Sequence, residues 1–226
     1  MHEVQPIPGR VESHEWLDTY ADDVQSQRRR RMMPRKLRVL GLDSIIDNSA
    51  AVVDLCCGVG ETLDVLYELG FRDITGVDIH ISDKLKADKR FNAVLGNACR
   101  PDIPSASKDW ILCLHSLHHL ETPERIAELV DSAYRILKPG GRISFIDFPN
   151  SPQIRAAFWF FLNCKPLLVT PYLKWFGTIT REEWPFLQHY LPRFPKVWKV
   201  INDSRFEREI NHHELFYFFL TLRKPQ

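Results

Sequence analysis

Between residues 50 and 147 the sequence alternates short apolar runs with amphipathic segments, and this alternation limits the possible fold more than any other feature. The apolar runs are apolar on both faces, which indicates a parallel sheet covered by helices on both sides. The expected strands are Ala51–Leu55, Ile74–Asp78, Ala93–Gly96, Trp110–Leu114 and Ile143–Asp147. The expected helices are Glu61–Leu69, Lys84–Lys89 after a Ser82 N-cap, and Pro123–Leu137, where Lys138-Pro-Gly-Gly-Arg142 ends the helix.

The two ends of the chain depart from this alternation. Residues 13–41 predict a helix in which Trp16, Leu17 and Tyr20 share a face, followed by the basic run Arg28–Arg31. Residues 151–200 are rich in aromatic residues and prolines and predict helices and loops. Two strand-like runs, 205–210 and 215–222, are separated by Asn211-His212-His213, which predicts an antiparallel hairpin with its turn at those three residues.

A glycine-containing loop separates the first expected strand from the first expected helix. Gly58 and Gly60 let the backbone approach a ligand, and the helix that follows offers unpaired N–H groups. Asp78 ends the second strand 20 residues after Gly58, at the spacing where a carboxylate accepts hydrogen bonds from ribose hydroxyls. The loop and the acid together predict a nucleoside site.

The residues around the loop favour one kind of nucleoside. A dinucleotide fingerprint requires a third glycine, but Leu63 stands in its place. Asp54, at the end of the first strand, would repel a pyrophosphate and attract the ammonium group of a methionine moiety. We therefore expect a cationic nucleoside, while a nicotinamide-dependent oxidoreductase stays the rival enzyme class.

Five segments occur in the order of the motifs of class I S-adenosylmethionine-dependent methyltransferases, which this chain resembles. The segments are 54–60 (DLCCGVG), 76–79 (GVDI), 96–98 (GNA), 109–120 (DWILCLHSLHHL) and 137–141 (LKPGG). The resemblance implies a Rossmann-like fold with a mostly parallel seven-stranded sheet, helices on both faces and a terminal antiparallel hairpin. It also implies a single domain, 1–226, with a helical cap over 1–45, a cofactor-binding core over 50–147, an aromatic-rich substrate lid over 148–200 and the hairpin over 205–222.

The resemblance also assigns the residues that would hold S-adenosylmethionine and its product S-adenosylhomocysteine. Asp78 would bind the ribose hydroxyls, with Ile79 beside the adenine and His115 near the transferred methyl group. The cofactor-binding positions are Asp54, Cys56, Gly58, Gly60, Asp78, Ile79, Asn97, Ala98 and His115. Two of them depart from the family, which usually has glycine at Cys56 and aspartate at Asn97.

Two residues are candidates for catalysis, His115 and Tyr20. His115 would end the fourth strand, and Tyr20 resembles an aromatic residue that caps the cofactor pocket in many relatives. A structural role is the alternative for both. We interpret the Cys56–Cys57 pair as two small packing residues, His118 and His119 as non-catalytic, and His212–His213 as surface residues, and we expect no metal site.

The acceptor is expected to be an apolar small molecule. Residues 148–200 are dense in aromatic side chains, and residues 183–195 are faintly similar to the ubiquinone and menaquinone C-methyltransferases. We expect methyl transfer to carbon or oxygen of a quinol, polyketide or other aromatic metabolite. A non-catalytic nucleoside-binding subunit is the alternative from a different class.

Composition excludes several partners. A formal net charge of +1 gives no electrostatic support for nucleic acid, and RNA methylation rests only on the basic run Arg28–Arg31, for which a solvated helix face is the alternative. The five cysteines form no C-x-x-C pair, and the first residues hold no apolar segment of a secretory signal, so we expect a cytoplasmic protein. Membrane contact is expected to be peripheral at most, and the oligomeric state is left open.

Overall fold

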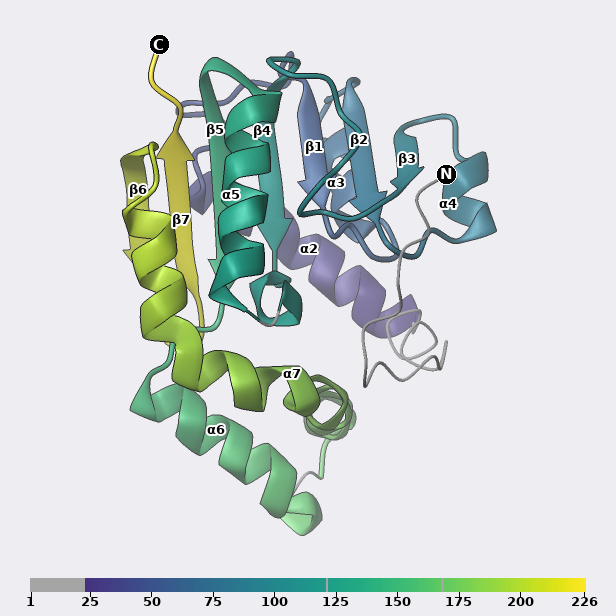
Figure 1. Cartoon of the computed structure of the whole chain (residues 1–226). Coiled ribbons are helices and arrows are strands. Elements are labelled where there is room, and N and C mark those ends of the chain that lie inside the picture. Colours follow the sequence, from purple (N-terminus) through teal and green to yellow (C-terminus); the bar gives the residue numbers. More distant parts are fainter. Residues whose placement is uncertain (1–22, 121, 168) are drawn as a thin grey trace.

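The computed structural model describes residues 23–120, 122–167 and 169–226, which form a layered α/β fold around one seven-stranded sheet (Figure 1). The strand order is β3-β2-β1-β4-β5-β7-β6; the first five strands are parallel, and β7 and β6 are antiparallel to their neighbours. The predicted fold class is therefore confirmed. The strands are β1 Val52–Leu55, β2 Ile74–Asp78, β3 Asn92–Leu95, β4 Lys108–Leu114, β5 Leu137–Asp147, β6 Glu207–His213 and β7 Phe218–Arg223.

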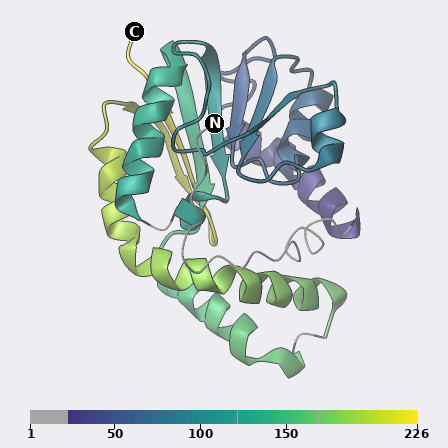
Figure 2. The ribbon, with the colours of Figure 1, turned by 45° about the vertical axis from the view of Figure 1, so that its right-hand side comes forward.

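Helices cover both faces of the sheet, and two more extend past its carboxyl edge (Figures 1 and 2). The α-helices are α2 Asp23–Val39, α3 Glu61–Glu68, α4 Asp83–Ala87, α5 Pro123–Ile136, α6 Pro152–Asn163 and α7 Pro171–Asn202, with short 3-10 helices η1 Leu117–Leu120 and η2 Lys165–Leu167. In Figure 1, α5 lies on the near face, α2 and α3 on the far face, and α6 with the first part of α7 below the strand ends. No helix among the described residues is long and apolar enough to span a membrane.

The core has two layers because successive residues of the buried strands point to opposite faces. Val52 belongs to the cluster that contains Leu37 of α2 and Leu66 of α3, whereas Val53 belongs to the cluster that contains Leu129 of α5. All four residues of β1 are buried. This packing explains why the strand sequence is a continuous apolar run and not an alternating one.

Predicted helix starts agree with the structure where a side chain caps the helix. The Ser82 hydroxyl accepts a hydrogen bond from the Leu85 N–H at 3.2 Å, and Thr122 does the same for Arg125 at 3.3 Å. Pro123 occupies the first turn of α5, where its missing N–H costs nothing. The helix predicted over residues 13–41 is confirmed within α2, and its first part lies outside the described residues.

The predicted hairpin exists, but its turn was placed wrongly. Asn211, His212 and His213 belong to β6 and pair with residues 218–220 of β7, and the turn spans residues 214–217. All three side chains are exposed, because β6 is the edge strand of the sheet. Polar residues on an exposed edge strand have the composition of a turn, so sequence alone does not separate the two.

The strand expected from Ile143 begins earlier, at Leu137. Lys138-Pro-Gly-Gly-Arg142 ends α5 as expected, but the chain continues directly into β5, with Leu137 paired to Lys108. Gly141 lies so close to its surroundings that a Cβ there would be 2.9 Å from the Lys138 carbonyl oxygen. The two glycines therefore support a tight strand entry in place of a loop.

Helix α7 is 32 residues long and contains Pro185, Pro192 and Pro195. Each proline lacks the N–H that would bond four residues back, and its ring pushes against the preceding turn. Figure 1 shows that the helix axis changes direction, so that the first part lies beyond the carboxyl edge and the last part runs alongside the sheet. The region predicted as helices and loops thus contains one long, bent helix.

Candidate cofactor and acceptor site

The loop between β1 and α3 is held open by its backbone conformation. Cys56, Gly58 and Gly60 all have positive φ angles, of 67°, 54° and 87°. The N–H groups of Cys56 and Cys57 donate to the Val77 carbonyl at 2.8 and 3.1 Å, which ties the loop to the end of β2. A Cβ on Gly58 would meet no atom within 4 Å, so the loop leaves room for a ligand at this point.

Cys56 stands at a position where glycine is the less strained residue. Left-handed backbone costs a residue with a side chain about 1–2 kcal/mol, which explains why the family usually has glycine there. The Cys56 thiol contacts the Cys113 thiol of β4, and this contact and burial raise the pKa of Cys113 well above its usual value. Burial also raises the pKa of Cys57. The enclosed thiol of Cys57 agrees with the packing role predicted for that residue.

Leu63, the residue that departs from the dinucleotide fingerprint, fits because the neighbouring strand β2 has a glycine, Gly76, where the Leu63 side chain packs. Leu63 is fully buried, and a Cβ on Gly76 would lie 2.6 Å from its Cδ1 and 2.8 Å from the Cys57 Sγ. In dinucleotide-binding proteins a glycine in the helix allows the helix to pack closely on the sheet. Here the glycine that allows close packing of α3 is Gly76 in β2.

Two buried carboxylates lie at the carboxyl ends of β1 and β2. Burial and the nearby Asp78 raise the pKa of Asp54 to about 8, although a hydrogen bond from Thr62 opposes this shift. Asp78 accepts hydrogen bonds from the Gly58 N–H and the His80 N–H, both at 2.9 Å, which fixes its orientation. Two like charges in a buried space favour a cationic ligand, which would stabilise the ionised form of both groups.

The residues expected beside the adenine lie along the ends of β2 and β3. Ile79 is 37 % exposed directly after Asp78, so its side chain is accessible to a ligand. Asn97 follows β3, and its Oδ1 accepts a hydrogen bond from the Cys99 N–H at 2.9 Å. Ala98 is buried. The structure thus brings the expected cofactor residues to one edge of the sheet.

His115 follows β4, at the point where the strand order of the sheet changes direction. It has a φ of 55°, and its N–H donates to the Ile146 carbonyl at 2.6 Å. Lys36 of α2 lies with its Nζ 2.7 Å from the His115 Nε2 and 4.8 Å from the centre of the Tyr217 ring. Burial and Lys36 lower the pKa of His115 well below its usual value, so the imidazole is neutral at neutral pH.

Lys36 is the contact that sequence reasoning missed at this site. Burial lowers its pKa to about 8, and Glu214 opposes the shift. It stands 79 residues before His115 in the chain, and no spacing rule connects the two. Tyr20, the other candidate for catalysis, lies outside the described residues.

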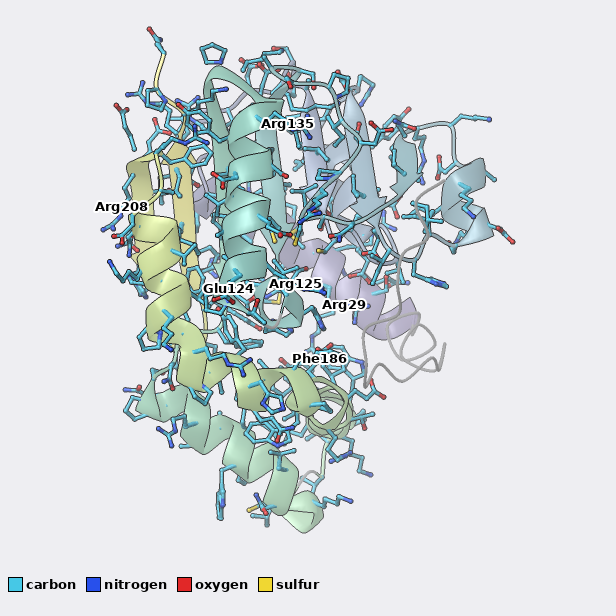
Figure 3. All side chains as sticks on the ribbon, viewed as in Figure 1. Arg29, Glu124, Arg125, Arg135, Phe186 and Arg208 are labelled. Carbon is cyan, nitrogen blue, oxygen red and sulfur yellow. The ribbon has the colours of Figure 1, made fainter. Side chains whose placement is uncertain are left out.

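The basic run of α2 packs against acidic residues of α3. Arg29, labelled in Figure 3, donates from its Nε to a Glu61 carboxylate oxygen at 2.7 Å, and Arg30 pairs with Asp64 at 3.2 Å. Arg29 also lies 5.5 Å from the ring centre of Trp175 in α7. These contacts occupy part of the run that would otherwise suggest an RNA-binding surface, and they bring α7 close to the cofactor loop.

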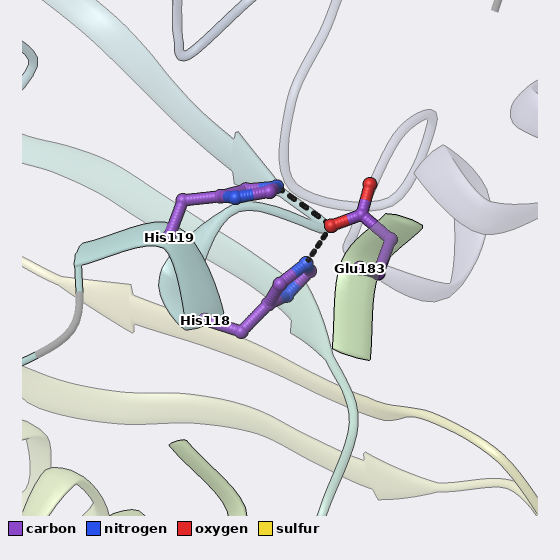
Figure 4. Close-up of side chains that lie close together, drawn as sticks. All are labelled: His118, His119 and Glu183. Atoms are coloured by element: carbon purple, nitrogen blue, oxygen red, sulfur yellow. Dashed lines mark hydrogen bonds and ion pairs between the residues drawn. The ribbon is translucent and has the colours of Figure 1, made fainter. Parts of the chain in front are cut away.

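A polar cluster where η1 meets α7 was not expected from the sequence. His118 is 2 % exposed, and its Nδ1 lies 2.9 Å from an oxygen of Asp147, which is fully buried at the end of β5. The Nε2 atoms of His118 and His119 each lie 3.3 Å from the same oxygen of Glu183 in α7 (Figure 4). Burial alone would lower the pKa of His118, but Asp147 and Glu183 raise it to about 10.

Aromatic side chains pack beside the histidines, near the ends of β4 and β5. Phe148 follows β5, and its ring lies 5.2 Å from both Phe158 of α6 and Tyr217, and 5.9 Å from His118. Phe186, labelled in Figure 3, lies 4.7 Å from the ring of His119. The carboxyl edge therefore carries two buried acids on the β1–β2 side, and aromatic rings beside the histidine cluster on the β4–β5 side.

These features define the class of the protein. A parallel sheet with a terminal antiparallel hairpin, a glycine loop that leaves room for a ligand, and two buried carboxylates that fit a cationic nucleoside describe an S-adenosylmethionine-dependent methyltransferase. The residues present fit this cofactor, because its positive charge would compensate the like charges of Asp54 and Asp78.

Comparison with known proteins gives the family. The model of a family described as "Methyltransferase domain" matches residues 24–196, and the chain belongs to this family. Its cofactor is S-adenosylmethionine, and the nicotinamide-dependent alternative is thereby set aside.

Individual relatives share about a quarter of their residues with this chain. A demethylmenaquinone methyltransferase of Listeria welshimeri is 27% identical over 184 residues, which cover 74% of this chain and 75% of that protein. A 2-phytyl-1,4-naphtoquinone methyltransferase of Thermosynechococcus vestitus is 24% identical over 192 residues, or 80% of this chain and 82% of that protein. Quinone methyltransferases are thus among the relatives, as the faint similarity of residues 183–195 indicates.

Among solved structures, the fold is similar to that of the 1,6-didemethyltoxoflavin-N1-methyltransferase of Burkholderia thailandensis, solved with 1,6-didemethyltoxoflavin and S-adenosylhomocysteine. The TM-score is 0.55 at 17% identity, and the match covers 98% of this chain and 94% of that structure. At this identity the comparison supports the fold.

Proposed function

We propose that this protein transfers a methyl group from S-adenosylmethionine to carbon or oxygen of an apolar small molecule, such as a quinol, a polyketide or another aromatic metabolite. The observation that carries the proposal is that aromatic rings gather at the ends of β4 and β5, beside the two buried acids at the ends of β1 and β2. The acids suit the cofactor, and the aromatic rings suit an apolar acceptor. Two relatives, the demethylmenaquinone and 2-phytyl-1,4-naphtoquinone methyltransferases, are named for quinone substrates, which supports an aromatic, oxygen-bearing acceptor.

On the cofactor side, each residue is assigned a binding role. Asp78 binds the ribose hydroxyls, Ile79 covers the adenine, and Asn97 with Ala98 contacts the adenine edge. Asp54, Cys56, Gly58 and Gly60 line the methionine and ribose part. The fixed orientation of Asp78 supports its role, because the Gly58 and His80 N–H groups hold the carboxylate in place before any ligand binds.

On the acceptor side, alignment and exclusion of water are the main requirements. S-adenosylmethionine supplies an electrophilic methyl group, and the acceptor atom must lie in line with the bond that breaks. Phe148, Phe158 and Tyr217 form an apolar wall that excludes water and packs against an aromatic ring. Residues 148–200 act as the substrate lid in this proposal, residues 1–45 as the helical cap, residues 50–147 as the cofactor-binding core and residues 205–222 as the terminal hairpin of one domain.

His115 and Tyr20 are the residues proposed to act nearest the methyl group. A neutral His115 accepts a hydrogen bond from Lys36 at its Nε2. The imidazole is held in one orientation by this bond and by the edge of the Tyr217 ring, 4.8 Å away. For a phenolic acceptor, the Lys36 ammonium would stabilise the oxyanion that attacks the methyl group, while Tyr20 would cap the cofactor pocket.

Calorimetric titration tests the cofactor assignment. Wild-type protein is titrated with S-adenosylhomocysteine and, separately, with NADH, and the same is done for Asp78→Ala. We expect S-adenosylhomocysteine alone to bind, and Asp78→Ala to weaken it about 100-fold, because two hydrogen bonds to a charged group are lost. Asp83→Ala is the matched control, since that carboxylate is fully exposed on α4. Binding of NADH, or unchanged affinity in Asp78→Ala, would contradict the proposed site.

Turnover with a labelled methyl donor tests the acceptor class. A panel of quinols, phenols and polyketides is compared with a protein mixture and with RNA. We expect methylation of aromatic small molecules only. Cofactor binding without turnover on any acceptor would favour a nucleoside-binding subunit, and turnover on protein or RNA alone would refute the acceptor class.

A further inference from the structure

Three potential metal ligands converge where η1 meets α7. His118 Nε2, His119 Nε2 and Glu183 Oε2 all lie within 4.8 Å of one another (Figure 4). Each histidine nitrogen is 3.3 Å from the Glu183 oxygen. The ligands come from two elements that are 65 residues apart in the chain, so sequence spacing gives no sign of them.

The separations agree with tetrahedral coordination. With metal–nitrogen and metal–oxygen bonds of about 2.0–2.1 Å, neighbouring ligand atoms of a tetrahedron lie about 3.3–3.4 Å apart. Two of the three separations have this length as the protein stands. The third, between the two histidine nitrogens, is no longer than 4.8 Å, and the His119 side chain is 37% exposed.

Asp147 supports the ligand geometry from behind. It lies 2.9 Å from His118 Nδ1 and also accepts the His118 backbone N–H at 3.2 Å. A histidine that binds a metal through one nitrogen donates its other N–H to a carboxylate in many metalloproteins, which fixes the ring and makes the ligand more basic. Since Asp147 is fully buried, His118 Nε2 is held towards Glu183.

We propose that His118, His119 and Glu183 bind a divalent transition-metal ion of the Zn²⁺ type, with Asp147 orienting His118. Two imidazoles and one carboxylate form a donor set typical of zinc sites that keep a position for water or a small-molecule oxygen. His119 and Glu183 are the more exposed ligands, with side chains 37% and 11% accessible against 3% for His118. The open position therefore lies on their side of the site.

A shared proton is the competing explanation for the cluster. Without a metal, an imidazolium at His118 between Asp147 and Glu183 satisfies the same atoms through hydrogen bonds. The two explanations differ in one respect. With a shared proton, the Glu183 oxygen accepts separate hydrogen bonds from the two rings and no ion is taken up; with a metal, all three atoms are ligands of a bound ion, so Zn²⁺ titration separates the explanations.

Metal titration of the chelator-treated protein tests the proposal. Zn²⁺ binding is followed by calorimetry, and Co²⁺ binding by its visible absorption, which is intense only for tetrahedral sites. We expect one ion per chain in the wild type. His119→Ala and Glu183→Gln should each weaken binding by at least about 10- to 100-fold, the loss that even an outer-shell change causes.

Two exposed histidines provide matched controls. His189→Ala, on the exposed side of α7, and His213→Ala, on the edge strand, should leave Zn²⁺ affinity unchanged. Unfolding curves confirm that each variant is folded, and His119→Ala removes only a half-exposed side chain. Absence of saturable binding in the wild type, or equal affinity in His119→Ala, Glu183→Gln and the controls, would overturn the proposal.

The result for the metal site can be distinguished from the result for the proposed methyltransferase function. Metal binding is measured without cofactor or acceptor, and S-adenosylhomocysteine affinity is measured on the same variants. We expect that affinity to stay within about threefold of the wild type, because Asp54 and Asp78 lie at the ends of other strands. Loss of cofactor binding in the metal-site variants would show that the two sites are one.

Discussion

The cofactor loop and the histidine cluster both bury charged groups, but they differ in how those charges are compensated. Asp54 and Asp78 are two acids, and burial and the charge of Asp78 raise the pKa of Asp54 to about 8, so that Asp54 holds a proton at neutral pH in the free protein. In the cluster, His118 lies between Asp147 and Glu183, so opposite charges meet within the protein itself. The loop thus depends on a ligand for its missing charge, whereas the cluster contributes to stability in the free protein.

Asp147→Asn should have the largest effect on stability. Removing one partner of a buried charge pair leaves the other uncompensated, so we expect the free energy of unfolding to fall by about 3 kcal/mol. Urea denaturation of the free protein measures this loss. If the cluster made no contribution of its own, the variant would unfold at the same urea concentration as the wild type, and the contrast with the loop would fail.

Asp54→Asn should raise the free energy of unfolding of the free protein, whereas Asp147→Asn lowers it. In the free protein the pKa of Asp54 is about 8, above its unfolded value of about 3.9, so folding takes up a proton between those values and stability falls as the pH rises. The variant has no carboxyl group at this position and therefore lacks this pH dependence. We expect the difference in unfolding free energy between variant and wild type to grow by about 2 kcal/mol between about pH 6 and 8, in favour of the variant.

Urea denaturation at several pH values, without cofactor, measures this difference. S-adenosylhomocysteine should bind the same variant more weakly, because the carboxylate that faces the ammonium group is lost. Parallel pH profiles for variant and wild type would mean that Asp54 is already compensated in the free protein.

Cys56→Gly should give the smallest effect. Glycine adopts the observed φ of 67° without strain, so we expect the free energy of unfolding to rise by about 1 kcal/mol. Ala106→Gly is the matched control: its φ is 50° on an exposed loop far from the ligand edge. Both should be stabilising, and only Cys56→Gly should alter S-adenosylhomocysteine affinity. Destabilisation by Cys56→Gly would show that the contact with Cys113 outweighs the strain.

The loop could be predicted from the sequence because its parts are local. Strand, glycines, helix start and Asp78 all fall within residues 52–78, and each has a recognisable residue type. The hydrogen bond from Gly58 to Asp78 spans 20 residues and closes this short unit. Local geometry and one strand pairing are enough to bring these groups together.

The cluster could not be predicted, because tertiary packing alone brings its members together. His118 and His119 resemble a common apolar-flanked pair, and Glu183 is one charged residue in a long helix. Only the bend of α7 and its packing on the end of the sheet place Glu183 beside both rings. The same holds for Lys36, which contacts His115 from a helix that precedes the first strand.

The prolines of α7 have a consequence for how this helix moves. Residues after Pro185, among them Leu187, Leu191 and Ile201, are buried in the core that also contains α5, whereas Tyr172 near the start is exposed. Interrupted hydrogen bonding at the prolines uncouples the two parts. Amide hydrogen exchange should therefore divide α7 into a faster segment before Pro185 and a slower one packed against the sheet.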